Sequence, residues 1–269
     1  MHRFKHVLTS ALLATLTLIL SGMSHATIVQ MQTQFGHIEI NLFDQSTPKT
    51  VANFLSYTAD NRYDNTLLHR AITDFIVQGG GYTLDEALAL QSVSKEDPVS
   101  NEPVYSNVRG TIAMAKFACS PDSATSEWFI NMNDNSANLD SQNGGFTVFG
   151  QVTEAGMAVL DEISALPTFN LSGTLANTPL QNFSVEDANN SNSVVAENFV
   201  YIDTIQITDT DVNSAATLTP ALNTLIANSS NSDCNGGSDH GGGVTSAGFL
   251  LLMLSILGLS RRATLTGNN

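Results

Sequence analysis

The sequence is poor in cysteine, in aromatic residues and in basic residues. Its 269 residues include two cysteines, one tryptophan and only 7% aromatic residues. Two cysteines cannot form the disulfide framework that holds small secreted folds together, and we expect no bond between Cys119 and Cys234. The hydrophobic share is 42%, so the chain can bury a core large enough to fold without such cross-links.

Positive charge is scarce. Ten Lys and Arg stand against 25 Asp and Glu, which gives a formal net charge of -15. Four of the ten, Arg3, Lys5, Arg261 and Arg262, lie in terminal segments that we predict to be removed or to face a membrane. So acidic a surface repels phosphate backbones, and we expect no nucleic-acid partner.

Metal-ligand patterns are missing as well. The six His residues do not show the spacing of a metal site. Asp134, Ser136 and Asn138 follow the spacing with which a calcium loop begins, but Leu139 stands where the sharp turn of that loop needs Gly. We therefore predict no metal and no other cofactor.

The N-terminal 26 residues have the pattern of a secretory signal peptide. Arg3 and Lys5 precede an apolar run, and Ser24-His25-Ala26 places small residues where a signal peptidase cuts. An uncleaved membrane anchor is the alternative, although the apolar run is shorter than the roughly 20 residues that a bilayer requires. We expect the mature chain to start near Thr27.

The C-terminal region divides into three parts. Residues 209–243 are rich in Asn, Ser and Gly and lack Lys and Arg, which predicts a flexible linker. Residues 244–262 form an apolar segment that ends in Arg261-Arg262, and residues 263–269 are a short tail. The apolar segment with the glycines before it resembles the GlyGly-CTERM sorting signal of certain Gram-negative bacteria.

That resemblance implies a segment that enters a membrane at least transiently and is cut near the glycines. A plain C-terminal membrane anchor is the alternative. The signal peptide and the C-terminal segment together predict an exported protein that is periplasmic, displayed on the cell surface or secreted.

Residues 27–208 form the single folded domain that we expect. Alternation of apolar and polar residues at 37–42 and 204–208 predicts half-buried strands near its two ends. The domain also holds many other short apolar runs. Residues 168–198 are rich in Asn, Ser and Thr, so we interpret them as a surface excursion before the last strand.

Two helices are predicted within the domain. Thr47-Pro48 is a helix start, with the Thr hydroxyl capping free amides and Pro in the first turn. A second helix fits Gly156 to Leu166, because Pro167 forbids continuation. Two helices among many short strands predict a closed antiparallel β-barrel that is capped at its ends.

Three blocks carry the chemistry of the domain. The first, residues 67–80, is predicted to be two apolar strands joined by a turn at Thr73-Asp74, with Arg70 and Gln78 in apolar surroundings. The others are residues 110–131 and 139–150, which supply aromatic and aliphatic side chains. We find no nucleophile with a base, because Ser126 lacks the glycine-flanked elbow of a hydrolase.

In order and spacing, these blocks resemble the cyclophilin family of peptidyl-prolyl cis-trans isomerases, and most closely its bacterial periplasmic members, over residues 28–208. The resemblance implies an all-β fold, a closed eight-stranded antiparallel barrel with two capping helices. It also implies a monomer that acts on proline-containing polypeptides, with Arg70 as the catalytic residue. The substrate-binding residues that it implies are His69, Phe75, Ile76, Gln78, Ala115, Lys116, Glu127, Phe129, Asn138, Leu139 and Phe146.

An arginine suits this reaction. Rotation about the bond before proline meets a barrier of about 18–20 kcal/mol because it breaks amide resonance. At the twisted state the prolyl nitrogen becomes a hydrogen-bond acceptor, and Arg70 would donate to it only there. The alternative function is a surface-displayed module that binds proline-containing segments with little turnover, and the presence of Arg70 favours the enzyme.

Four positions depart from common family members. Glu127 replaces a usual Gln, Lys116 an Asn that is usual in eukaryotic members, and Phe146 a pocket His. Asn138 replaces the Trp that favours cyclosporin, which predicts weak binding of that drug. We expect Lys116 and Glu127 to form an ion pair at the pocket rim, in place of two neutral amides.

Overall fold

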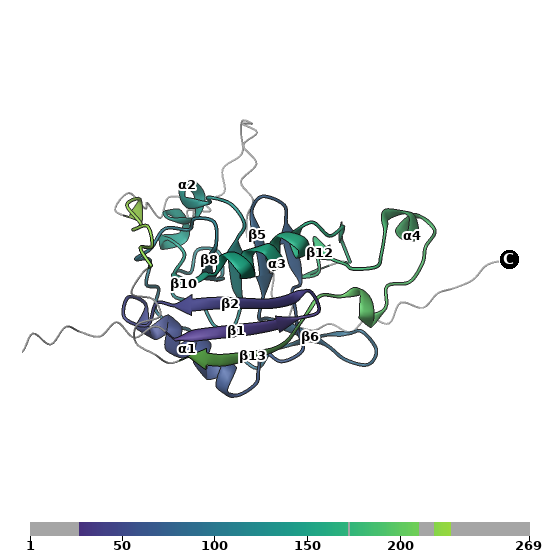
Figure 1. The fold of residues 1–269 in the computed structure, drawn as a ribbon, viewed down its shortest axis with the longest axis horizontal. Coiled ribbons are helices and arrows are strands. Elements are labelled where there is room, and N and C mark those ends of the chain that lie inside the picture. Colours follow the sequence, from purple (N-terminus) through teal and green to yellow (C-terminus); the bar gives the residue numbers. More distant parts are fainter. Residues whose placement is uncertain (1–26, 172, 210–217, 227–269) are drawn as a thin grey trace, which may run out of the picture.

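The computed structural model describes residues 27–171, 173–209 and 218–226, and Figure 1 shows their arrangement. The predicted signal peptide, the apolar segment 244–262, the tail 263–269 and Cys234 lie outside the described residues. The strands are β1 (Ile28–Thr33), β2 (Gly36–Leu42), β3 (Thr66–Leu67), β4 (Arg70–Ile72), β5 (Ile76–Gly79), β6 (Tyr82–Leu84), β7 (Leu90–Ser92), β8 (Thr111–Met114), β9 (Trp128–Asn131), β10 (Val148–Val152), β11 (Thr168–Phe169), β12 (Thr178–Pro179) and β13 (Tyr201–Asp209). The α-helices are α1 (Pro48–Ala59), α2 (Ser136–Leu139), α3 (Glu154–Ser164) and α4 (Val185–Asn189), and 3-10 turns cover Gln142–Gly144 and Ala196–Asn198.

One antiparallel sheet forms the body of the molecule. Its strand order is β3-β13-β1-β2-β10-β8-β9-β5-β4, so β3 and β4 are its two edges. These edges belong to one continuous run of chain. The amide of Leu68 donates to the carbonyl of Val200 on the β13 side, and the amide of His69 donates to the carbonyl of Gln78 in β5.

Because that run pairs on both sides, the sheet curls until it meets itself. Counted as one strand, β3 and β4 bring the number of strands around the barrel to eight, which confirms the predicted eight-stranded antiparallel barrel. The inside of the barrel is filled by the main apolar core, whose largest fully buried side chains include Trp128, Tyr57 and Phe54.

The two predicted helices are confirmed, but the expected cap of α1 is wrong. The hydroxyl of Thr47 donates back to the carbonyl of Phe43 at 3.2 Å. The first free amides of the helix, those of Lys49 and Thr50, instead donate to the carboxylate of Glu102 at 3.3 and 3.0 Å. A carboxylate that the tertiary fold brings to the helix start thus takes the place of the local cap. Its negative charge also interacts favourably with the positive N-terminal end of the helix dipole.

Helix α3 begins two residues earlier than predicted. The hydroxyl of Thr153 caps it by accepting from the amide of Gly156 at 3.2 Å. Its apolar face is buried through Leu160 and Ile163, and the helix packs against β2. It ends at Ser164, before Pro167.

The predicted surface excursion contains more structure than its composition suggests. Strands β11 and β12 pair within it, and α4 follows. Leu180, Phe183 and Phe199 are buried in a cluster with Leu67 of the barrel. These few apolar residues anchor a stretch that is otherwise polar.

Two findings concern the region predicted as a linker and the cysteines. Residues 218–226, which lie within 209–243, contact the barrel through an antiparallel bridge between Tyr105 and Leu222.

Cys119 is disulfide-bonded, contrary to our expectation. No helix among the described residues is long and apolar enough to span a membrane.

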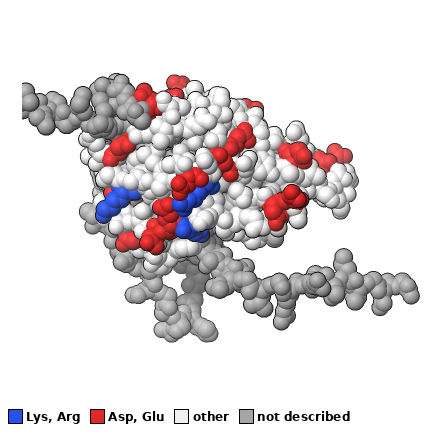
Figure 2. All heavy atoms as spheres, turned by 90° about the horizontal axis from the view of Figure 1, so that it is seen from below, with Lys and Arg blue, Asp and Glu red and all other residues white. Residues whose placement is uncertain are grey.

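The surface is acidic. Figure 2 shows one face on which Asp and Glu outnumber Lys and Arg. Arg62 is paired with two carboxylates, those of Asp60 and Glu96. Arg70, by contrast, forms no ion pair with any carboxylate among the described residues.

Candidate active site

The site begins at the hairpin of β4 and β5. Its turn is tight: the amide of Phe75 donates to the carbonyl of Ile72 at 3.0 Å, and Asp74 takes a positive φ of 56°. This turn sets Arg70 directly opposite Gln78 in the ladder. The two side chains therefore lie on the same face, and Nη1 of Arg70 donates to Oε1 of Gln78 at 3.3 Å.

The pairing continues across the sheet. Gln78 lies opposite Phe129 of β9, and Phe129 lies opposite Ala113 of β8. Their sequence neighbours Val77 and Ile130 belong to the main core inside the barrel. Because successive residues of a strand point to opposite faces, the row from Arg70 to Ala113 lies on the outer face of the barrel.

An apolar cup adjoins this row. It is formed by the predicted residues Ile76, Phe129, Leu139 and Phe146, with Phe75 packed against them. The rings of Phe129 and Phe146 meet edge to face at 5.6 Å. Strands β5 and β9, the end of α2 and the start of the β10 region each supply a wall, so residues distant in sequence meet here.

A buried polar network lies on the other side of Gln78. Nε2 of Gln78 donates to Oε2 of Glu127 at 3.0 Å, and Nε2 of His69 lies 3.5 Å from the same oxygen. Tyr82, which the sequence did not indicate, also forms a side-chain hydrogen bond with the Glu127 carboxyl. Arg70, Gln78 and Glu127 thus form a chain in which the carboxyl fixes the orientation of the amide that faces the guanidinium.

Burial sets the protonation of this network. It raises the pKa of Glu127 to about 7. Burial, followed by the charge of Arg70, lowers the pKa of His69 to about 3, so this imidazole is neutral at physiological pH. Burial also lowers the pKa of Arg70, which is half-buried. An arginine nonetheless stays charged, and its desolvated guanidinium is available to a ligand.

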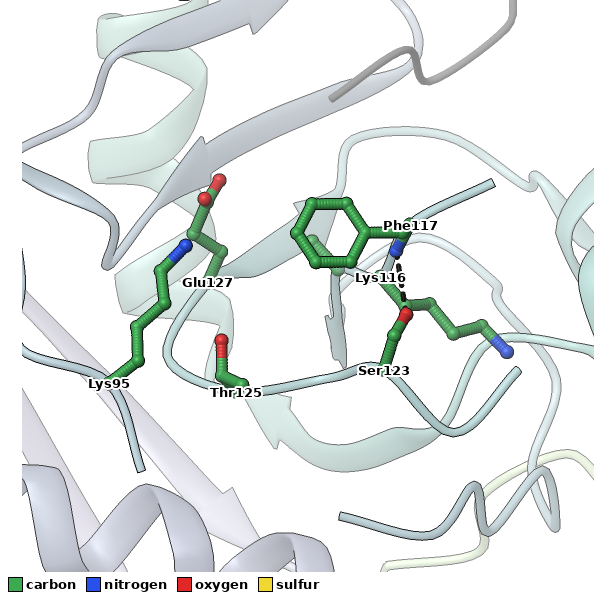
Figure 3. A pocket seen from close by; sticks show the side chains of 7 residues that line it. Lys95, Lys116, Phe117, Ser123, Thr125 and Glu127 are labelled. Atoms are coloured by element: carbon green, nitrogen blue, oxygen red, sulfur yellow. Dashed lines mark hydrogen bonds between the residues drawn. The ribbon is translucent and has the colours of Figure 1, made fainter. Parts of the chain in front are cut away.

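The predicted ion pair between Lys116 and Glu127 is wrong. The ammonium of Lys116 donates to the carbonyls of Asn143 and Gly145 at 2.9 and 2.6 Å. Figure 3 shows Lys116 running away from Glu127, while Lys95 approaches it. The charge of Lys95 lowers the pKa of Glu127 against the effect of burial.

A shallow depression lies beside Glu127. Its wall includes the backbone of Ala115, whose amide donates to the carbonyl of Glu127 at 2.9 Å. The lining residues are Lys95, Ala115, Lys116, Phe117, Ser123, Thr125 and Glu127. Asn138 is exposed and lies outside the cup cluster. Lys116 also belongs to neither the cup cluster nor the polar network, although its ammonium lies 4.9 Å from the centroid of the Phe146 ring.

Comparison with known proteins matches this site to a family. The family model for cyclophilin type peptidyl-prolyl cis-trans isomerases matches residues 28–190. A peptidyl-prolyl cis-trans isomerase of Acinetobacter baylyi is 38% identical over 179 residues, which cover 63% of this chain and 92% of the relative. Peptidyl-prolyl cis-trans isomerase B of Escherichia coli is 38% identical over 165 residues, covering 60% and 96%.

Among solved structures, a cyclophilin type isomerase of Cryptosporidium parvum matches with a TM-score of 0.49 and 23% identity, over 68% of this chain and 98% of that one. The family assignment rests on the sequence matches, and residues 28–190 include all three motif blocks. The chain therefore belongs to the cyclophilin-type family and, by that homology, is a peptidyl-prolyl cis-trans isomerase.

Proposed function

We propose that Arg70 catalyses the isomerisation by donating a hydrogen bond to the prolyl nitrogen as the bond before proline twists, while the cup holds the pyrrolidine ring. One observation carries this proposal. Arg70 is a half-buried cation whose side-chain partner is a neutral amide, that of Gln78, and it stands at the edge of an apolar cup. A cation desolvated without a counter-ion is disfavoured unless it has a ligand to meet.

The size of the effect follows from hydrogen-bond energies. A charge-assisted hydrogen bond contributes about 1.5–3 kcal/mol, and about 1.4 kcal/mol changes a rate tenfold. Arg70 alone therefore accounts for about tenfold to a few hundredfold. The remaining acceleration comes from the dry cup and from Gln78, which would hold the peptide main chain so that one side of the bond turns against the other.

The test is a protease-coupled assay on a short peptide with an Xaa-Pro bond, comparing wild type with Arg70→Ala and Arg70→Lys. We expect kcat to fall by about tenfold to a few hundredfold in both variants, with KM little changed, because the bond forms only in the transition state. Arg62→Ala, which removes a surface arginine, is the matched control and should stay near wild type. Wild-type activity in Arg70→Ala would refute the mechanism.

We also propose that the mature protein starts at Thr27 and acts on exported proteins. The pattern of residues 1–26 supports this, as does the place of Thr27 in the fold. Its backbone nitrogen and its hydroxyl both donate to the carboxylate of Asp44, at 2.7 and 2.8 Å. After cleavage, the new terminal ammonium would face that carboxylate as an ion pair.

The intact mass of the protein recovered from outside the cytoplasm tests both processed ends. We expect a chain that begins at Thr27 and ends near the glycines at 241–243. A mass that includes Met1 would refute the signal peptide. A mass that includes Asn269 would refute cleavage of the tail and favour the plain anchor.

A further inference from the structure

A short segment beyond the barrel lies against the active-site face. It runs from Leu218 to Ile226 and is coloured yellow-green beside α2 in Figure 1. The amide of Ser106 donates to the carbonyl of Ala221 at 2.8 Å, and the amide of Asn223 donates to the carbonyl of Val104 at 2.9 Å. The segment therefore adds one antiparallel bridge to residues 104–106.

The side chain of Asn223 fixes the segment to a wall of the cup. Its Nδ2 donates to the carbonyl of Asp140 at 2.8 Å, while its Oδ1 accepts from the amides of Leu225 and Ile226. Asp140 directly follows Leu139. The Cδ1 atom of Ile226 also lies so close to Gly145 that a Cβ there would be 3.0 Å from it. The segment thus touches the loop between two cup residues.

Leu218 is partly buried and packs against the apolar cluster that contains the cup residues Ile76, Phe129, Leu139 and Phe146. The other members of that cluster are Phe43, Ala113, Ala115 and Val148. In this arrangement the four cup side chains are 0, 0, 0 and 2% exposed. A proline ring can enter only if some of this surface is uncovered, and displacement of Leu218 would uncover part of the cluster against which it packs.

We propose that residues 218–226 are an intramolecular ligand of the active-site face and compete with proline-containing peptides for the cup. The inference rests on the proposed function of the cup, and it adds a partner for that site, the protein's own C-terminal segment. Eight residues join Asp209 to Leu218, so the segment is presented at an effective concentration on the order of millimolar. Contacts as modest as these therefore suffice to oppose a weakly bound peptide.

The chain offers a matched pair of variants for the test. Leu218→Ser removes the side chain that packs against this cluster, whereas Leu222→Ser makes the same change in the same segment at a side chain that is 65% exposed. Binding of a fluorescein-labelled tetrapeptide with Ala-Pro at its centre is measured by anisotropy on the full chain. We expect Leu218→Ser to bind about fivefold more tightly, as loss of a half-buried leucine contact implies, and Leu222→Ser to bind as wild type. Equal affinity in all three proteins overturns the proposal.

Hydrogen exchange at Ser106 gives a second readout that needs no turnover. Its amide should exchange slowly in wild type and faster in Leu218→Ser, and saturating peptide should speed it in wild type, because competition is reciprocal. No response to peptide overturns the proposal. Failure of the proposed function can be told apart from failure of this proposal. If every variant binds peptide as expected but none isomerises it, the role of Arg70 is refuted and the competition between the segment and the peptide stands.

Discussion

The carboxyl of Glu127 is the best place to test the electrostatics of the site. We predict that Glu127→Gln stabilises the protein in alkaline buffer and has little effect on stability in acid. Only 6% of Glu127 is exposed, and burial raises its pKa from 4.5 to about 7. The amide is close in shape and keeps an oxygen that can accept from Nε2 of Gln78.

The sign follows from proton linkage. Between pH 4.5 and about 7 the folded protein holds a proton on Glu127 that the unfolded chain has lost, so stability falls as the pH rises through this range. Above about pH 7 the full penalty of a buried carboxylate is present. The two pKa values correspond to about 3 kcal/mol at most.

Urea denaturation at pH 5 and pH 8 measures the effect as the difference between variant and wild type. Other titrating groups, such as Lys116, are present in both proteins and largely cancel. We expect the gain of Glu127→Gln at pH 8 to exceed that at pH 5 by about 2 kcal/mol. Glu162→Gln, the same change at an exposed position, is the control. A variant that is destabilised equally at both pH values would refute this account of the buried carboxyl.

Three further outcomes are expected. Gly80→Ala should lower the melting temperature far more than Gly173→Ala, because both residues have positive φ but only at Gly80 would the Cβ meet the Ser126 carbonyl, at 2.7 Å. The pH profile of kcat/KM should lack a histidine step near 6.5, since the pKa of His69 is about 3; an inflection there that persists in Glu127→Gln would contradict this. Asp140→Ala should cost on the order of 3 kcal/mol in urea denaturation, because the buried carboxylate accepts from Ser106 and Asn107, and a loss under 1 kcal/mol would show that these donors find other partners.

Much of the catalytic face could be predicted because it is encoded locally. The block predicted a hairpin around Thr73-Asp74, and the hairpin is there, but its register depends on the turn: the loop has three residues, 73–75, and this places Arg70 opposite Gln78. The family resemblance implied Ile76, Phe129, Leu139 and Phe146 as substrate-binding residues, and these apolar side chains from different blocks lie in one cluster. The motif blocks also sufficed to indicate the family.

Partners of charged groups could not be predicted in the same way. Opposite charge suggested that Lys116 would meet Glu127, but the structure gives Lys116 two backbone carbonyls and Glu127 the amide of Gln78. The cap of α1 shows the same limit, since Glu102 lies more than fifty residues along the chain from the amides whose hydrogen bonds it accepts. Neither partner leaves a local signal in the sequence.

The sequence by itself determined the strand periodicity, the two helices, the hairpin around Thr73-Asp74 and the membership of a family. Each of these depends on residues close together in the chain or on short motifs. Only the tertiary structure decided the protonation of Glu127 and the packing of Leu218 against the cluster that contains the cup residues. The physical reason is that desolvation and apolar contact depend on which distant segments cover a side chain, and that covering exists only once the sheet has curled closed.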